Sequence, residues 1–222
     1  MTSGPMRRPT RKIVEAGYDQ LKSRYGQWTL TVDPRHRVDY LERLMDLLSA
    51  GSRVLELGCG PGIPIGIEID QAGHTYVGVD LSREQLEIAR GNVAGGKFIR
   101  ADMTEIDFEP GAFDAIAAFY SIIHVPRDLH AELFARICRW LKPGGLFVAS
   151  LGATDNPGGV DAWIDDVPMY WSGHDAETNI AMLEAAGLRL LRHEVLQNFE
   201  DDQEVMFLWV IGQRLGLQAQ TL

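Results

Sequence analysis

The pattern of apolar and polar residues changes near residue 50, from helical spacing to short apolar runs. A lid helix is predicted over residues 13–25, where apolar side chains recur at helical spacing: Ile13, Val14, Gly17, Leu21 and Tyr25. A second helix is predicted from Asp33-Pro34, an N-cap followed by proline, to a terminal glycine at Gly51. Residues 13–50 are therefore interpreted as a helical lid, and the basic, proline-containing residues 1–12 as a disordered tail.

Strand and helix patterns alternate through the rest of the chain. Helical stretches follow Gly62, begin at Ser82 and cover residues 129–141, and five strands are predicted around them: Arg53–Leu57, Thr75–Asp80, Lys97–Ala101, Phe113–Tyr120 and Leu146–Leu151. The chain continues with a predicted helix over 175–186 and two longer strands, 188–199 and 204–214. These two strands are expected to form an antiparallel pair. The alternation indicates an α/β fold with a mostly parallel sheet covered on both faces. Residues 152–173 are predicted to be an irregular insertion.

Composition limits the number of domains and the class of partner. The chain has 222 residues, of which 45% are hydrophobic, enough for one core and a single domain over 13–214 with a short tail, 215–222. A net charge of −10 disfavours binding to a phosphate backbone, so no nucleic-acid partner is expected. The two cysteines, and a sequence without an apolar run of membrane-spanning length, predict a cytoplasmic protein that has no membrane partner. Both a monomer and a homodimer stay open.

The segment VLELGCGPG, residues 54–62, carries the strongest chemical signal. It has the pattern of a strand that enters a glycine turn and opens a helix, so that bare backbone and free N–H groups can face a ligand. A dinucleotide fingerprint requires G-x-G-x-x-G, whereas Gly58, Gly60 and Gly62 place the third glycine one residue early. Glu56, just ahead of the turn, favours a cationic ligand over a pyrophosphate. We therefore expect S-adenosylmethionine; the alternative is a structural corner in which the glycines serve packing only.

Carboxylates stand at the ends of the next two strands. Asp80 follows the glycine turn by about 20 residues, and its two oxygens match the 2′ and 3′ hydroxyls of a ribose. The alternative role, an N-cap, is better filled by Ser82, with Gln85 at the capping-box position. Asp102 can accept from an adenine amino group while the Met103 backbone donates to a ring nitrogen; a turn cap is the alternative for Asp102. Because these strand ends meet at one edge of an open sheet, a single cofactor site is predicted.

With VLELGCGPG, VGVDLS, FIRADM, FDAIAAFYSIIHVPR and LKPGGLFVAS in this order, the chain resembles the class I, seven-stranded S-adenosylmethionine-dependent methyltransferases. The similarity is to the small-molecule type, such as the ubiquinone/menaquinone and sterol methyltransferases. It implies a Rossmann-like sheet of order 3-2-1-4-5-7-6 with strand 7 antiparallel, and an N-terminal helix that carries Tyr18 or Tyr25 over the methionine end of the cofactor. Pro61, between the last two glycines, departs from the family and leaves fewer backbone donors. The expected cofactor-binding residues are Tyr18, Tyr25, Glu56, Gly58, Cys59, Gly60, Asp80, Leu81, Gln85, Asp102, Met103, Phe119 and Ser121.

His124 and Tyr120, just past the fourth strand, are the candidate catalytic residues. Methyl transfer is an in-line displacement, so the protein mainly aligns the reactants and excludes water. A base is needed only where the nucleophile carries a proton, and a histidine with an ordinary pKa near 6.5 suits that task. The alternative is that the His124 ring packs on the cofactor or bonds to backbone.

Missing motifs narrow the substrate class. Residues 119–121 lack the Asn/Asp-Pro-Pro-aromatic turn of relatives that act on amide or adenine nitrogens, and no glutamate pair follows as in arginine methyltransferases. Catechol-type enzymes bind magnesium through an Asp-Asn on strand 5, whereas Asp155-Asn156 lies beyond Ser150. A metal-independent reaction is therefore expected.

The insertion 152–173 is where this family builds its acceptor pocket. Its candidate acceptor residues are Trp163, Met169, Tyr170 and Trp171, with His174 just after it as a second active-site candidate. Aromatic side chains in a loop either seal the domain edge or line an apolar pocket. The second interpretation predicts a small hydrophobic or aromatic acceptor of secondary metabolism, oxygen as the favoured nucleophile and S-adenosylhomocysteine as product. A C-, N- or S-methyltransferase and a noncatalytic S-adenosylmethionine-binding module are the alternatives.

Overall fold

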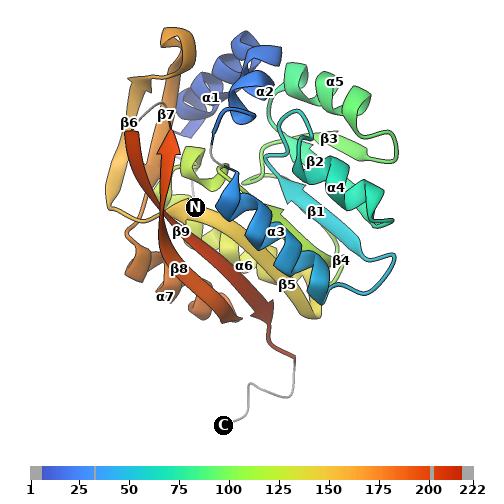
Figure 1. Ribbon diagram of the computed structural model, residues 1–222. Coiled ribbons are helices and arrows are strands. Elements are labelled where there is room, and N and C mark those ends of the chain that lie inside the picture. The colour runs from blue at the N-terminus through green and yellow to red at the C-terminus, as the bar shows by residue number, and fades with distance from the viewer. Residues whose placement is uncertain (1–6, 33, 201–202, 217–222) are drawn as a thin grey trace.

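A seven-stranded sheet forms the centre of the molecule (Figure 1). The computed structural model describes residues 7–32, 34–200 and 203–216. The order is β3-β2-β1-β4-β5-β9-β8, with bounds Arg53–Leu57 (β1), Thr75–Asp80 (β2), Lys97–Arg100 (β3), Phe113–Ala118 (β4), Leu141–Gly152 (β5), Leu188–Glu200 (β8) and Gln203–Arg214 (β9). Strands β1 to β5 pair in parallel, and β9 runs antiparallel to both β5 and β8. The predicted order 3-2-1-4-5-7-6 is confirmed, since β8 and β9 are the sixth and seventh strands of this sheet.

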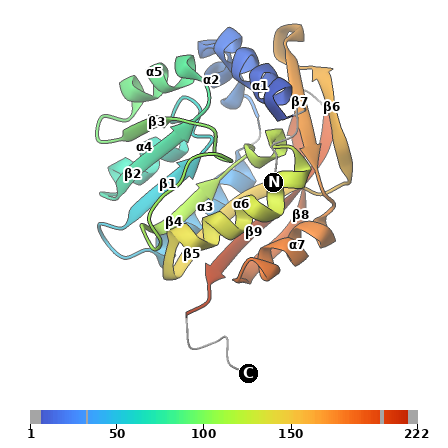
Figure 2. The same cartoon turned by 180° about the vertical axis from the view of Figure 1, so that it is seen from behind.

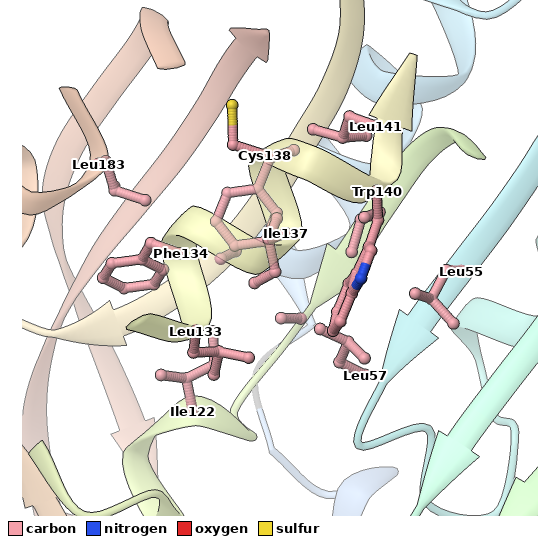
Figure 3. Close-up of a cluster of buried hydrophobic side chains, with 14 of the residues drawn as sticks. Leu55, Leu57, Ile122, Leu133, Phe134, Ile137, Cys138, Trp140, Leu141 and Leu183 are labelled. Atoms are coloured by element: carbon pink, nitrogen blue, oxygen red, sulfur yellow. The ribbon is translucent and has the colours of Figure 1, made fainter. Parts of the chain in front are cut away.

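Helices cover both faces of the sheet and bury an apolar core on each (Figures 1 and 2). One face carries Arg35–Leu47 (α3), Ile65–Gln71 (α4) and Arg83–Asn92 (α5); the other carries His130–Trp140 (α6) and Ala176–Ala185 (α7). Phe134 and Trp140 of α6 are fully buried in one cluster with Leu55 and Leu57 of β1, as Figure 3 shows. The central strands are continuous apolar runs because both of their faces are covered. Since they are parallel, their carboxyl ends meet at one edge of the sheet.

The first lid helix, predicted as one helix over residues 13–25, is two helices in the structure. Helix α1 covers Arg7–Leu21 and α2 covers Ser23–Thr29. Lys22, between them, has a positive φ of 48°. The Gln85 side chain donates to the carbonyls of Tyr18 (3.1 Å) and Lys22 (3.0 Å), which holds the break against α5.

The N-terminal boundary also differs from the prediction. Residues 7–12, expected in a disordered tail, belong to α1. Arg11 pairs there with Glu105 at 2.8 Å, so the start of the helix is tied to the loop after β3. The predicted cap Asp33 and residues 1–6, 201–202 and 217–222 lie outside the described residues.

The segment 152–173 is a β-hairpin, where an irregular insertion was predicted. Strands Asn156–Ala162 (β6) and Pro168–Gly173 (β7) form a separate two-stranded sheet. The strand pattern was hidden by the glycines and the proline of this segment. The hairpin is stabilised by close contact with α1: a Cβ at Gly17 would lie 2.7 Å from the Met169 Cε and 3.1 Å from the Pro168 carbonyl oxygen. Three short helical turns, Ile122–His124 (η1), Arg127–Leu129 (η2) and Ile164–Asp166 (η3), complete the chain. Within the described residues, no helix is both long and apolar enough to cross a bilayer.

Candidate active site

The glycine loop lies at the carboxyl end of β1, beneath the lid. The backbone N–H groups of Gly58 (2.8 Å) and Cys59 (3.0 Å) donate to the Val79 carbonyl at the end of β2. Gly58 has φ 74°, and a Cβ there would lie 2.3 Å from the Ser121 Cβ; a Cβ at Gly60 would lie 3.2 Å from the Tyr25 ring. Only glycine fits both positions, because the conformation is left-handed and the loop is approached from both sides.

A cavity of about 670 Å³ separates the lid from the ends of the parallel strands. This volume is in the usual range for a small-molecule site. Of the residues expected to bind the cofactor or to react, eleven border it: Tyr18, Tyr25, Gly58, Gly60, Asp80, Leu81, Asp102, Met103, Tyr120, Ser121 and His124. Sequence reasoning missed the outer walls, which come from α1 (Thr10, Arg11, Val14) and from the start of α6 (Leu133, Arg136). A helical period does not reveal which face of α1 meets a ligand.

Asp80 and Asp102 have free acceptor capacity at this cavity. The Asp80 carboxylate accepts from the N–H groups of Gly60 and Ser82, each at 2.8 Å, so each oxygen keeps a second lone pair for a hydroxyl. Burial raises the pKa of Asp80 to about 6, against the backbone hydrogen bonds that lower it. Asp102 accepts twice from Thr104 through Oδ1 (2.8 and 2.7 Å), and its Oδ2 makes no hydrogen bond of this kind but lies 3.8 Å from the Arg11 Nε. This set fits a ribose and an adenine amino group.

Four residues expected at the cofactor do not border the cavity. The Glu56 carboxyl is buried beneath the loop, where the Tyr76 hydroxyl donates to it, and burial raises its pKa to about 8. The Cys59 thiol is buried in the same apolar cluster as Phe119. Gln85 holds the end of α1 instead. Asp80 and Arg37, which line the larger and the smaller cavity, also shift the pKa of Glu56, so this carboxyl lies close behind the cavity wall, and its direct contact with a cofactor stays a prediction.

His124 lies in a chain of hydrogen bonds between the lid and the hairpin. Its Nδ1 lies 2.8 Å from the Tyr170 carbonyl oxygen of β7, and its Nε2 lies 2.9 Å from the Tyr18 hydroxyl of α1. A carbonyl can only accept, so Nδ1 carries the proton, and Nε2 of the neutral ring accepts from Tyr18. Burial lowers the pKa of His124 to about 4, which keeps the ring neutral at pH 7.

Tyr120 lies in the wall of the cleft and is held from both ends of its side chain. Its φ of 51° is left-handed, and its hydroxyl accepts from the Asn198 amide at 2.7 Å. Its ring packs against Phe207 and Trp209. The hydroxyl keeps its own proton to donate, so the catalytic role of Tyr120 stays a prediction.

A second cavity, of about 30 Å³, adjoins the first. Tyr18, Tyr25, Tyr120 and His124 line both cavities, so these side chains separate them. Trp28, Trp163 and Trp171 add three indole rings to the smaller one.

Of the predicted acceptor residues, Trp163 and Trp171 therefore reach a cavity, and three others do not. Met169 is fully buried under α1, near Gly17. Tyr170 contributes its carbonyl to His124. His174 lies 3.1 Å from the Arg127 carbonyl and packs on His130, away from both cavities.

Arg37 is a site residue that the sequence analysis missed. It is 8% exposed and lines the smaller cavity, and its Nε is without a hydrogen-bond partner among the described residues. A buried guanidinium with an unused donor fits an anion such as the carboxylate at the methionine end of S-adenosylmethionine. The spacing in α3 was an available signal, because the buried residues Tyr40, Leu41 and Leu44 follow Arg37 by three, four and seven positions and so share its helix face.

The fold and the site define a class I α/β domain for an adenosine cofactor, and comparisons with known proteins agree. Residues 54–145 match the family described as the methyltransferase domain. The methyltransferase GfsG of Streptomyces halstedii is 34% identical over 135 residues, 54% of this chain and 47% of that protein. The ubiquinone biosynthesis O-methyltransferase of Thiobacillus denitrificans is 30% identical over 138 residues, 59% of this chain and 58% of that protein. The chain thus spans about half the length of these curated relatives.

Solved structures extend the likeness to nearly the whole chain. The 1,6-didemethyltoxoflavin-N1-methyltransferase of Burkholderia thailandensis, solved with 1,6-didemethyltoxoflavin and S-adenosylhomocysteine, superposes with a TM-score of 0.73 at 18% identity, covering 97% of this chain and 93% of that one. At this identity the likeness concerns the fold. Residues 54–145 thus carry a methyltransferase domain, and the chain has the fold of the class I S-adenosylmethionine-dependent methyltransferases.

Proposed function

We propose that the protein transfers a methyl group from S-adenosylmethionine to an oxygen of a small hydrophobic or aromatic metabolite. The observation that carries this proposal is the Tyr18–His124 hydrogen bond at the junction of the two cavities. A proton acceptor there lies between a cofactor-sized cleft and an aromatic pocket. The relatives support methyl transfer to small molecules, and the aromatic walls support the acceptor class.

The larger cavity is suited to hold the cofactor. Asp80 would accept from the ribose hydroxyls and Asp102 from the adenine amino group. Arg37 lines the adjoining smaller cavity, beside Tyr25, and would donate there to the carboxylate once the lid has moved. Bound there, S-adenosylmethionine would supply a methyl group activated by its sulfonium. Tyr18 and Tyr25 of the lid would cover that end of the cleft and exclude water, and S-adenosylhomocysteine would remain as product.

His124 is suited to take the proton of the acceptor. Its neutral Nε2 already accepts from Tyr18, so a hydroxyl at this point gives its proton to Nε2 directly, or gives it to Tyr18 while Tyr18 passes its own proton to Nε2. The Nδ1–H bond to the Tyr170 carbonyl fixes the tautomer and the direction of the ring. The alternative role, packing on the cofactor, uses the same position without proton transfer.

The smaller cavity is suited to receive the reacting end of the acceptor. A volume of about 30 Å³ is close to that of one water molecule, so admission of an aromatic acceptor requires the lid or the hairpin to move. The indoles of Trp28, Trp163 and Trp171 would then contact the acceptor ring.

The reaction is also proposed to be independent of metal. Among the described residues, no three His, Cys, Asp or Glu side chains are grouped in a way that could hold an ion. Turnover that is lost with EDTA and restored by magnesium would contradict this part of the proposal.

The proposal is tested by incubating the protein with S-adenosylmethionine and matched acceptors that differ only in the nucleophile: a phenol, a thiophenol, an aniline and the O-methylated phenol as a blocked control. Mass spectrometry detects S-adenosylhomocysteine and the methylated product. Product from the phenol and not from the blocked control supports an O-methyltransferase. Preference for the thiol or the amine would mean that the nucleophile is sulfur or nitrogen and not oxygen. Cofactor binding without any product in a wider acceptor panel, carbon acids included, would favour a noncatalytic module.

A further inference from the structure

The Trp171 indole is the closest aromatic neighbour of His124 among the described ring pairs. The two ring centroids are 4.5 Å apart and the planes are inclined by 42°. Tyr18 meets the imidazole edge-on at 5.5 Å, and Trp163 lies at 6.4 Å. Trp171 belongs to β7, as does Tyr170, so one strand supplies both the carbonyl at Nδ1 and the ring beside the imidazole.

The surroundings of His124 contain no countercharge that would favour its protonated form. From α1 it receives the Tyr18 hydroxyl, from β7 the Tyr170 carbonyl and the Trp171 indole, and from the turn before η3 the Trp163 indole. Only burial and the Tyr170 carbonyl shift its pKa, and no carboxylate of the described residues contributes. A proton taken up at Nε2 would therefore create a cation without an anionic partner.

We propose that Trp171 is a positioning residue that stabilises the His124 imidazolium through a cation–π interaction. This inference rests on the proposed base role of His124. The face of an indole attracts a cation within about 6 Å of its centroid, and the attraction is strongest where water is excluded. Because the imidazole is neutral before proton transfer and charged after it, the indole stabilises the later state more than the ground state. Trp171 thus acts through His124, beyond its contact with an acceptor.

The test replaces Trp171 by 5-fluoro- and 5,6,7-trifluorotryptophan in the full chain, because fluorination weakens the negative face of the ring and scarcely changes its shape. The readout is the pKa of His124, followed by NMR of isotope-labelled histidine, with the signal assigned from the His124→Gln variant. We expect the pKa to fall progressively, by up to about 0.4 to 1.5 pH units. The same substitutions at Trp28, whose ring packs on Tyr25 and Trp163, are the matched control and should leave the His124 pKa unchanged.

The outcome is decided by the sign of the shift. An unchanged pKa in the fluorinated series overturns the proposal, and so does a rise. If the trifluorinated chain does not fold, the singly fluorinated chain gives the same direction with a smaller shift. The titration needs no acceptor, so its failure is distinguishable from failure of the proposed function: a pKa that falls in a chain without methyl transfer would leave the cation–π contact standing and remove only its catalytic use.

Discussion

The cofactor half and the acceptor half of the cleft are built in different ways. The cofactor half consists of backbone and carboxylates at the ends of β1, β2 and β3, adjacent strands whose register the sheet fixes. The acceptor half brings together α1, η1 and the β6–β7 hairpin, which are distant in sequence and meet mainly through side chains. The arrangement of the cofactor half can therefore be predicted from the sequence, while the arrangement of the acceptor half depends on how the lid packs against the hairpin.

The largest expected effect separates chemistry from cofactor binding. Replacing His124 by Ala should lower kcat by roughly 10²–10⁴-fold and leave the affinity for S-adenosylmethionine nearly unchanged, because the proposed role of His124 is to take the proton of the acceptor and not to bind a cofactor group. Single-turnover rates and calorimetry measure the two quantities. His193→Ala, on the exposed side of β8, is the control. A loss that saturating cofactor restores would assign His124 to packing on the cofactor.

The pH dependence of kcat sharpens the same point. Burial lowers the pKa of His124 to about 4, and the base works only when neutral, so kcat at saturating cofactor should persist below pH 6 and fall as the pH drops through about 4. Protonation of Asp80, whose pKa is about 6, should weaken cofactor binding and not kcat. An exposed histidine would instead lose activity near pH 6.5. A rate profile from pH 3.5 to 8, with circular dichroism to confirm folding at each point, distinguishes them. An acid limb near 6.5 would count against the buried, neutral base.

In the cofactor half, loss of the Asp80 carboxylate should weaken binding without a specific effect on chemistry. We expect Asp80→Ala to cost about 1–3 kcal/mol of cofactor affinity, because the ribose hydroxyls lose their acceptors. Titration calorimetry with S-adenosylhomocysteine measures this, and Asp46→Ala, on the exposed face of α3, is the control. Unchanged affinity in Asp80→Ala would remove Asp80 from the site.

The smallest effect concerns the rigidity of the glycine loop. Gly58 and Gly73 have similar φ values, 74° and 81°, but only at Gly58 would a Cβ meet another residue. Gly73→Ala should cost about 1–2 kcal/mol for the left-handed conformation alone, and Gly58→Ala more, because Ser121 must also move. Urea denaturation measures the free energy of unfolding of both. If the two variants lose the same free energy of unfolding, Ser121 can move away from a Cβ at position 58 without loss of stability.

The sequence predicted the sheet and most of the residues that it was expected to bring to the larger cavity, because both follow from local patterns. Strand alternation gave the α/β order, and the position after a strand placed Asp80 and Asp102 at the cleft. The burial of Glu56 beside Tyr76 was not predicted, because the end of a strand does not say which face of the sheet a side chain meets. The hairpin was missed because its packing against α1 decides it. Arg37 was missed although it shares the buried face of α3, because arginine is usually exposed.

The most direct test of the central claim is calorimetry of the purified chain with S-adenosylhomocysteine and, under identical conditions, with NAD. The glycine spacing, the two strand-end carboxylates and Arg37 predict one-to-one binding of S-adenosylhomocysteine and no measurable heat from NAD. Preference for NAD, or absence of S-adenosylhomocysteine binding by a folded chain, would contradict the account.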